Sequence, residues 1–149
     1  MNPPVTIRHS GTRDRRAFGE IDPRAANDLS RRAKIDAATA ARRCWVAERK
    51  GRLIGYAVLT DHFYDRPFID IVYVAEDARR SGGGGALLAA VERSVSGDRI
   101  FTSTNESNEA MRALLLKSGY TPSGRIENLD ANDPELVFVK FLKPSGATR

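Results

Sequence analysis

The stretch IDIVYVAEDARRSGGGGALLAAVE, residues 69–92, decides the fold of this chain. It begins with a run of apolar strand formers, passes through four consecutive glycines at 82–85 and continues into a segment rich in Ala and Leu. A flexible linker is the simplest interpretation of such glycines, but the flanking strand and helix are both apolar and each needs the other for burial. Glycine in regular structure costs roughly 0.5–1 kcal/mol per residue relative to alanine. We therefore expect an ordered turn whose cost is offset by a functional role.

The order strand, glycine-rich turn, helix predicts a site for a phosphate group. The first N–H groups of a helix lack partners, and the helix dipole places partial positive charge there. Arg79 and Arg80 add cationic donors, although a solvated turn is their simpler interpretation. The nucleoside triphosphate loop is excluded because no Lys-Ser or Lys-Thr follows the glycines, and GxGxxG fails because leucines 87 and 88 stand at the third glycine. The pattern R-x-x-G-x-G fits residues 79–84.

Length and composition indicate one soluble globular domain, residues 1–149, with a loose tail from about residue 143. The chain has 149 residues, of which 41% are hydrophobic and 29% charged. No apolar run approaches a membrane span, and the N-terminus lacks the apolar core of a secretory signal. The single cysteine, Cys44, cannot form an intrachain disulfide. We expect a cytoplasmic protein that does not contact a membrane.

The formal net charge is +5 and the pI about 9.7, which raises the question of a polyanionic partner. A basic nucleic-acid-binding protein is the lesser alternative function. Acids are interleaved with the bases of the N-terminal third, as expected for solvated helix faces. No helix-turn-helix, zinc-finger or RNA-binding aromatic signature accompanies the charge. We therefore expect no nucleic-acid partner, and the modest basic excess suits an anionic cofactor.

Hydrophobic periodicity, caps and turn residues predict the order β-α-α-β-β-β-α-β-α-β-β. This is an α/β (α+β) chain in which helices cover a mixed sheet. In the helix at 107–118, Ala110, Met111, Leu114 and Leu115 are expected to face inward, and Gly119 is a C-cap. The expected elements are strand 5–9, helices 13–21 and 24–41, a hairpin turning near 50–51, a turn at 65–67, central strand 68–75, helix 84–96, strand 98–104, helix 107–118 and a closing hairpin.

Two of these segments together resemble the GCN5-related N-acetyltransferase (GNAT) superfamily. Its central unit is a strand, then [QR]-x-x-G-x-[GA], then a helix, and residues 69–92 match that whole unit. Its second motif is a strand followed by an Asn that opens a helix ending in Gly-aromatic. FTSTNESNEAMRALLLKSGY, residues 101–120, matches it with Asn108 and Gly119-Tyr120. The element order along the whole chain agrees with the family.

The resemblance implies a GNAT acyl-CoA N-acyltransferase fold and acetyl-CoA as the acyl donor. The acetyl group would move to a primary amine of a small-molecule or protein acceptor by direct attack in a ternary complex. No metal is implied, and dimers are common in the family, so a homodimer is an open expectation. Asn108 also has a simpler role as the N-cap of its helix. The implied cofactor-binding residues are Val72, Tyr73, Val74, Arg79, Arg80, Ser81, Gly82, Gly83, Gly84, Gly85 and Asn108.

One departure from the family concerns the general acid. Members commonly protonate the leaving thiolate with a Tyr four or five residues before the Gly-aromatic pair, and Leu115 stands at that position. Three outcomes are open: the thiolate leaves unassisted or takes a proton from water, another hydroxyl such as Tyr64 or Tyr73 substitutes, or acyl-CoA binds without turnover. The last outcome defines the main alternative function, a non-catalytic acyl-CoA-binding module.

The acids near the expected acceptor site are Asp70 and Asp61. His62 is a candidate relay, and a structural or merely exposed histidine is its simpler interpretation. Strand alternation places Asp70 on one face with Val72 and Val74. Asp70 is the candidate general base, and an edge or surface carboxylate that pairs with an arginine is the equal alternative.

The remaining expectations concern the acid-rich stretch 124–136 and the glycines. The stretch is most simply a solvated hairpin turn, and the sharper hypothesis is that Glu127 or Glu135 attracts a cationic acceptor. Gly82 and Gly84 occupy motif positions, so Gly82→Val should abolish CoA binding. Gly83 is an extra glycine, which should tolerate isoleucine.

Overall fold

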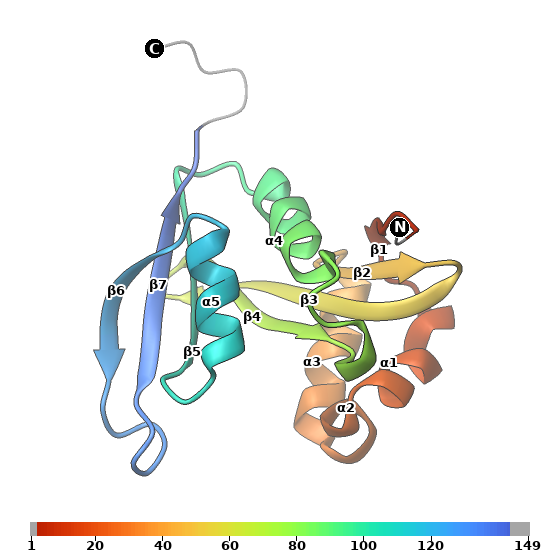
Figure 1. Cartoon of the computed structure of the whole chain (residues 1–149), viewed down its shortest axis with the longest axis horizontal. Coiled ribbons are helices and arrows are strands. Elements are labelled where there is room, and N and C mark those ends of the chain that lie inside the picture. Colours follow the sequence, from red (N-terminus) through yellow and green to blue (C-terminus); the bar gives the residue numbers. More distant parts are fainter. Residues whose placement is uncertain (1–2, 144–149) are drawn as a thin grey trace.

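A computed structural model describes residues 3–143 of the chain. It contains one seven-stranded mixed sheet with helices on both faces (Figure 1). The predicted order of elements is confirmed, with one additional short helix. The elements are β1 (Thr6–His9), the 3-10 turn η1 (Thr12–Asp14), α1 (Arg15–Ile21), α2 (Pro23–Asn27), α3 (Leu29–Ala40), β2 (Cys44–Arg49), β3 (Arg52–Phe63), β4 (Arg66–Val74), the 3-10 turn η2 (Glu76–Ala78), α4 (Gly83–Ser94), β5 (Arg99–Asn105), α5 (Glu109–Lys117), β6 (Thr121–Ile126) and β7 (Glu135–Phe141).

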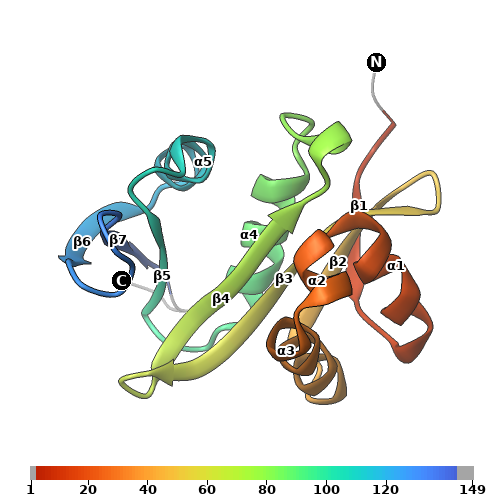
Figure 2. The ribbon, with the colours of Figure 1, turned by 90° about the horizontal axis from the view of Figure 1, so that it is seen from below.

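The strands lie in the order β1-β2-β3-β4-β5-β7-β6. All neighbours are antiparallel except β4 and β5, which run parallel at the middle of the sheet. Within the described residues this central pair makes two register contacts, Phe68 with Phe101 and Ile69 with Thr102. Beyond them the two strands diverge, as Figure 2 shows from below. Among the described residues, the backbone of β4 after Ile69 therefore has no strand partner on its β5 side.

A β-bulge in β4 accompanies this divergence. On β3, the adjacent residues Val58 and Leu59 pair with Ile71 and Ile69, so Asp70 is an extra residue without a partner across the pair. The bulge resets the alternation of side chains. Ile69 belongs to the apolar cluster under α4 and α5, whereas Ile71 belongs to the cluster under α1–α3.

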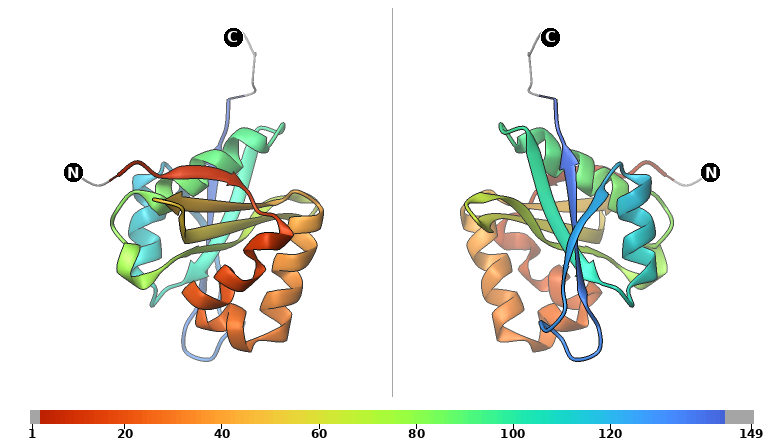
Figure 3. Two further views of the ribbon diagram at one scale, coloured as in Figure 1. Left: turned by 90° about the vertical axis from the view of Figure 1, so that its right-hand side faces the viewer. Right: turned by 90° about the vertical axis from the view of Figure 1, so that its left-hand side faces the viewer.

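The core is divided between the two faces of the sheet (Figure 3). On one face α4 packs three fully buried side chains, Leu87, Leu88 and Val91, against the sheet, and α5 adds Leu115. On the other face α1–α3 pack Phe18 and Ile35, with smaller neighbours, against the inner strands. This arrangement leaves α4 and α5 side by side over the point where β4 and β5 diverge (Figure 1).

The N-terminal helical region differs from the expectation of one helix over residues 24–41. The structure ends α2 at Asn27 and begins α3 at Leu29. Two aspartates explain the extra break, because each caps a helix. Asp22 accepts from the Arg24 N–H, and Asp28 accepts from the N–H groups of residues 30 and 31.

The C-terminal helices show smaller differences. α4 ends at Ser94 rather than near residue 96. Ala110 is exposed rather than inward-facing, because it lies about 140° around α5 from the buried Leu115. Gly119 takes the positive φ of 92° expected of a C-cap glycine. The predicted loose tail, apart from Lys143, lies outside the described residues. Among the described helices, none is long and apolar enough to cross a membrane.

A buried charged group holds helices α1–α3 against the face of the sheet that they cover. Asp22 is 1% exposed and accepts hydrogen bonds from the Tyr56 hydroxyl at 2.5 Å and from Arg31 at 3.2 Å. Burial and the Asp22 carboxylate both raise the pKa of Tyr56, so the phenol stays protonated and donates. The network joins the α1–α2 junction and α3 to the middle of β3.

A second ion pair fastens β1 to the first helical turn. Arg8 donates two parallel hydrogen bonds to Asp14, at 2.8 and 2.9 Å, and a third to Glu48 on β2. The Asp14 carboxylate, 6% exposed, also accepts from the Gly11 N–H at 2.8 Å. The guanidinium of Arg8 lowers the pKa of Asp14 below the ordinary value of 3.8.

The Asp14 contribution to stability should therefore depend on pH. A carboxylate with a depressed folded-state pKa stabilises the protein above its unfolded pKa and loses that effect as the pH falls through the folded pKa. Asp14→Asn should lower the free energy of unfolding by about 1–3 kcal/mol at pH 7. The difference from wild type should shrink in urea titrations below about pH 4.

Asp36→Asn is the matched control. The Asp36 side chain is 46% exposed, so its ion pair with Arg15 should contribute less than about 1 kcal/mol to the free energy of unfolding. A difference between wild type and Asp14→Asn that stays constant from pH 7 to pH 3 would contradict the role given to the ion pair.

Candidate active site

The glycine loop, residues 79–85, joins η2 to the first turn of α4. Its chain direction depends on two residues with positive φ, Arg80 at 62° and Gly82 at 93°. The first backbone bond of the helix runs from the Ala86 N–H to the Gly82 carbonyl at 3.1 Å. Within the described residues, the N–H groups of Gly83, Gly84 and Gly85 have no backbone acceptor. Three such donors at the positive end of a helix are an arrangement that suits an anion, and the anion site itself stays a prediction from the sequence.

The structure gives a different account of the glycine at each of the four positions 82–85. Gly82 needs its positive φ, and Gly84 lies where a Cβ would come within 2.8 Å of the Leu114 side chain on α5. Gly82 is therefore required by its conformation, whereas a side chain at Gly84 would have to displace the end of the Leu114 side chain. A Cβ at Gly83 would lie 3.4 Å from Ile54, whereas one at Gly85 meets nothing within 4 Å.

This geometry corrects the expectation for Gly83. The position is buried, so alanine fits against Ile54 but the larger isoleucine side chain would displace it. Gly85, and not Gly83, is the glycine that the fold leaves free to change.

The arginines of the loop take different positions. Arg79 folds back on its own strand: its Nε donates to the Val74 carbonyl at 3.1 Å, and its guanidinium lies 5.7 Å from the Tyr73 ring centroid. Arg80 is exposed beside the free N–H groups. The Ser81 hydroxyl donates to the Ala78 carbonyl and so closes η2. Of the two predicted anion donors, Arg80 is the uncommitted one.

The predicted strand residues 72–74 lie where β4 has left β5. Val72 and Val74 are half-buried against the cluster under α4 and α5. Tyr73 points to the opposite face, where its ring lies 6.0 Å from that of Tyr56. Asn108 caps α5, accepting from the Met111 N–H at 3.1 Å, and its side chain is exposed. The N-cap role of Asn108 is thus present in the structure.

Asp70 lies on the α3 side of the sheet and not with Val72 and Val74. The expectation from alternation was wrong because Asp70 is the bulge residue of β4. Its carboxylate, 25% exposed, lies 3.2 Å from the Lys34 ammonium on α3. Asp61, the other candidate, is half exposed and pairs with Arg43 at 2.6 Å. His62 is exposed near the end of β3.

Leu115 is fully buried, and the two proposed substitute hydroxyls lie elsewhere. Tyr73 faces the opposite side of β4, and Tyr64 is 87% exposed in the β3–β4 turn. Sequence reasoning missed two threonines of β5, whose buried side chains alternate with half-buried ones. The Thr102 hydroxyl donates to the Ile69 carbonyl at 2.9 Å, at the last rung of the β4–β5 pair.

Thr104 is the next residue on that face of β5, beyond the last rung. It is 8% exposed, and its hydroxyl has no hydrogen-bond partner among the described residues. The period-two burial of β5 follows from its sequence alternation, which is the signal that could have identified it.

The acid-rich turn between β6 and β7 is held by its own acids. Asp133 accepts from Ser107, and Asp130 accepts from Asn105, which ties the turn to the end of β5. Glu127 pairs with Arg125 at 2.5 Å. Most of these carboxylates therefore have structural partners, as the simpler interpretation expected.

Glu135, on β7, accepts from the Ser103 hydroxyl at 2.6 Å. Ser103 is on the face of β5 opposite Thr102 and Thr104. This is also the face of the sheet on which Asp70 meets α3. Glu135 is thus the acid of this stretch placed on the same face as the candidate base.

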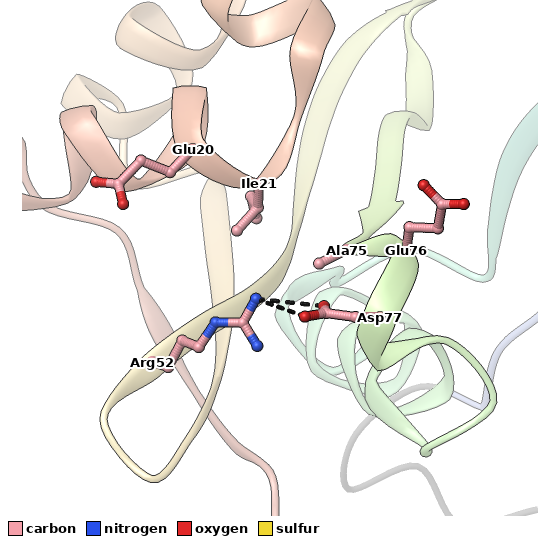
Figure 4. Close-up of a pocket in the computed structure, with 6 residues that line it drawn as sticks. All are labelled: Glu20, Ile21, Arg52, Ala75, Glu76 and Asp77. Atoms are coloured by element: carbon pink, nitrogen blue, oxygen red, sulfur yellow. Dashed lines mark hydrogen bonds and ion pairs between the residues drawn. The ribbon is translucent and has the colours of Figure 1, made fainter.

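A surface hollow of about 460 Å³ lies beside η2, the turn that precedes the glycine loop in the chain (Figure 4). Arg52 bridges part of its rim to Asp77, at 3.0 and 3.2 Å. The hollow lies between the end of α1, the start of β3 and η2, and not at the β4–β5 divergence. No group of three or more potential metal-ligating side chains occurs among residues 3–143. The residues around the hollow are Glu20, Ile21, Arg52, Ala75, Glu76 and Asp77.

The different roles of the glycines give a direct test. Gly85→Ala should raise the free energy of unfolding by about 0.5–1 kcal/mol, because it restricts the unfolded chain at a helical position with open space. Gly82→Ala should lower it by about 1–2 kcal/mol, because the position requires the left-handed conformation. Urea denaturation of both variants measures the two effects. Equal changes in both variants would show that neither conformation nor space distinguishes these positions.

Comparison with known proteins agrees with this geometry. A sequence profile of the acetyltransferase (GNAT) family matches residues 12–120. A GNAT-family acetyltransferase from Bacillus cereus is 29% identical, with a TM-score of 0.86 over 93% of this chain and 97% of that chain. A ribosomal-protein-alanine N-acetyltransferase from Brucella melitensis is 26% identical, with a TM-score of 0.73 over 92% and 99%.

A third structure shares the fold at lower identity. It is yncA from Salmonella typhimurium, solved with its cofactor acetyl-CoA, at 20% identity and a TM-score of 0.76 over 96% of each chain. No curated protein matches the sequence at a significant level. The family profile covers most of the chain, including the glycine loop and α5. The chain therefore belongs to the GNAT family of acetyltransferases.

Proposed function

We propose that the protein transfers an acetyl group from acetyl-CoA to a primary amine by direct attack in a ternary complex. The observation that carries the proposal is the juxtaposition of an unpaired length of β4 with the free N–H groups of the glycine loop. A long ligand with an amide-containing arm and a diphosphate needs both features, in this order along the chain. The acetyl-CoA bound by the Salmonella protein of the same fold supports this choice of donor.

The residues of the loop fit the diphosphate of acetyl-CoA. The N–H groups of residues 83–85 point from the end of α4 without backbone acceptors. Arg80 adds an exposed guanidinium, and Gly82 and Gly84 keep side chains out of the approach. When bound, the thioester supplies the activated acyl group. The protein supplies the binding energy, the orientation and the proton transfers.

Asp70 is the group we assign to proton removal from the acceptor. It stands at the bulge, one residue past the last β4–β5 rung, and faces the side of the sheet opposite α4 and α5. An ammonium group is unreactive until it loses a proton, which a carboxylate within reach can accept directly or through water. Lys34 contacts this carboxylate, so the acceptor amine must compete with the Lys34 ammonium.

The charges that develop during the reaction are met by backbone N–H groups of β4 and by water. Backbone N–H groups of β4 near Val74, unpaired toward β5, are suited to stabilise the oxyanion that forms at the carbonyl carbon. With Leu115 at the usual Tyr position, the thiolate leaves with a proton from water. A CoA thiol is a weak enough base for this to occur without a protein acid.

The distribution of basic residues argues against a nucleic-acid partner. Seven arginines of the N-terminal half have carboxylate partners on this chain. Paired guanidinium groups attract phosphates less than free ones. The pairs are Arg8–Asp14, Arg15–Asp36, Arg16–Glu20, Arg24–Asp28, Arg31–Asp22, Arg43–Asp61 and Arg52–Asp77.

Release of free thiol from acetyl-CoA in the presence of a panel of primary amines tests the proposal. Wild-type protein should release thiol with at least one amine. Asp70→Asn should lower kcat/KM by about 10²–10⁴-fold, because the amide cannot accept the proton. Asp61→Asn, a half-exposed carboxylate paired with Arg43, is the control and should keep full activity. CoA binding without thiol release on any amine would favour a non-catalytic acyl-CoA-binding module.

The role of position 115 can be tested by restoring a hydroxyl. Leu115→Tyr and Leu115→Phe add nearly the same volume to a buried site, and both should cost about 1–3 kcal/mol of stability. The Tyr variant should have a kcat about tenfold above that of the Phe variant, because only its phenol can donate to the thiolate. Thiol-release assays at equal folded fraction measure this ratio. A ratio of one would show that position 115 does not reach the leaving group.

A further inference from the structure

Arg49 makes two unusual contacts at the end of β2. Its Nη2 donates to the Ser81 carbonyl at 2.9 Å, and its Nε donates to the Pro3 carbonyl at 2.9 Å. The side chain is partly buried, and among the described residues it has no carboxylate partner. A partly buried guanidinium that is used on two backbone carbonyls indicates a role in holding backbone rather than in charge pairing.

The Ser81 carbonyl belongs to the peptide group that enters Gly82. In a trans peptide the C=O and the following N–H point in opposite directions. A guanidinium that fixes the Ser81 carbonyl on one side therefore fixes the Gly82 N–H on the other. The bond to a cation also polarises the peptide, which makes its N–H a stronger donor.

The glycine loop needs such an anchor because its backbone has alternatives. Gly82 populates positive and negative φ with similar ease, so the 81–82 peptide could rotate at low cost. Arg80, with a φ of 62°, is in a conformation that costs a non-glycine residue roughly 1–2 kcal/mol. Among the described residues, the two other side-chain contacts with the loop backbone or from the loop, from Arg79 to Val74 and from Ser81 to Ala78, involve its first half. The Arg49 contact is the one that reaches the entry to the helix.

We propose that Arg49 is a positioning residue for the donor: it holds the Ser81–Gly82 peptide so that the Gly82 N–H joins those of residues 83–85 toward the diphosphate. The inference rests on the proposed function, since it concerns affinity for CoA. Arg49 is expected to change the affinity for CoA only through the contacts of the diphosphate. The acyl group, the amine and the proton transfers lie outside the reach of this side chain.

The test compares Arg49→Met with Arg52→Met. Arg52 pairs with Arg49 across the β2–β3 hairpin, and its exposed guanidinium contacts Asp77 instead of the loop backbone. Isothermal titration with CoA should give a Kd about tenfold higher for Arg49→Met and an unchanged Kd for Arg52→Met. In turnover, Arg49→Met should raise the KM for acetyl-CoA while kcat and the KM for the amine stay at wild-type values.

S-acetylpantetheine, which lacks the diphosphate, separates positioning from a general structural effect. Its kcat/KM should be the same for wild type and Arg49→Met. Arg49→Lys keeps one donor within reach of a carbonyl and should have an intermediate Kd for CoA, which covers the case in which Arg49→Met folds poorly.

The outcomes distinguish the two proposals. Wild-type protein that does not bind CoA would overturn the proposed donor itself. Wild-type binding with an equal Kd for Arg49→Met would overturn only the role of Arg49. An equal loss of activity on S-acetylpantetheine and acetyl-CoA would also overturn it, because the effect would then not lie at the diphosphate.

Discussion

The parallel pairing of β4 with β5 is limited to two register contacts, and the rest of the site depends on that limit. A sheet that paired fully at its centre would use the backbone of residues 70–74 internally. The bulge at Asp70 turns β4 away from β5 and, in the same step, moves the Asp70 carboxylate to the α3 side. One local irregularity therefore exposes backbone on one side of the strand and places a carboxylate on the other.

The divergence is held open by contacts at both ends of α4. Near its first turn, Gly84 lets Leu114 of α5 come close. Near its last turn, Glu92 accepts from Tyr120 at 2.9 Å and from Lys140 of β7 at 2.8 Å. Burial and the Glu92 carboxylate raise the pKa of Tyr120, so this phenol remains a donor. Beyond the two β4–β5 register contacts, the two halves of the sheet are thus joined through helices rather than through strand pairing.

The sequence predicted the features that depend on local chemistry. The glycine loop, the C-cap at Gly119 and the order of elements follow from residue type and spacing, whereas the resemblance to the GNAT family marked Gly82 and Gly84 as motif positions. The break at Asp28 had a local signal as well, an N-capping aspartate before a helical run. The inner-face threonines of β5 could have been found from alternation.

Features that depend on distant partners could not be predicted in this way. The side on which Asp70 lies is set by how Val58 and Leu59 of β3 pair with β4. The space available for a side chain at position 83 is limited by Ile54. The contact of Arg49 with Ser81 spans 32 residues and leaves no pattern in either segment. In each case tertiary structure decides between conformations that the local sequence allows equally.

The unpaired side of β4 has a consequence for association with other chains. Free strand edges usually lie at the outside of a sheet, where any extended polypeptide can add to them. Here the free edge lies at the centre of the sheet, between β3 and β5, with α4 and α5 side by side above it (Figure 1). A second β-strand would have to force these helices apart, whereas a thin flexible arm would not. For the donor that we propose, this edge would offer strand-like hydrogen bonding to the amide-containing arm, while the helices above it would exclude the strands of neighbouring chains. Such a selection by cross-section needs no side chain.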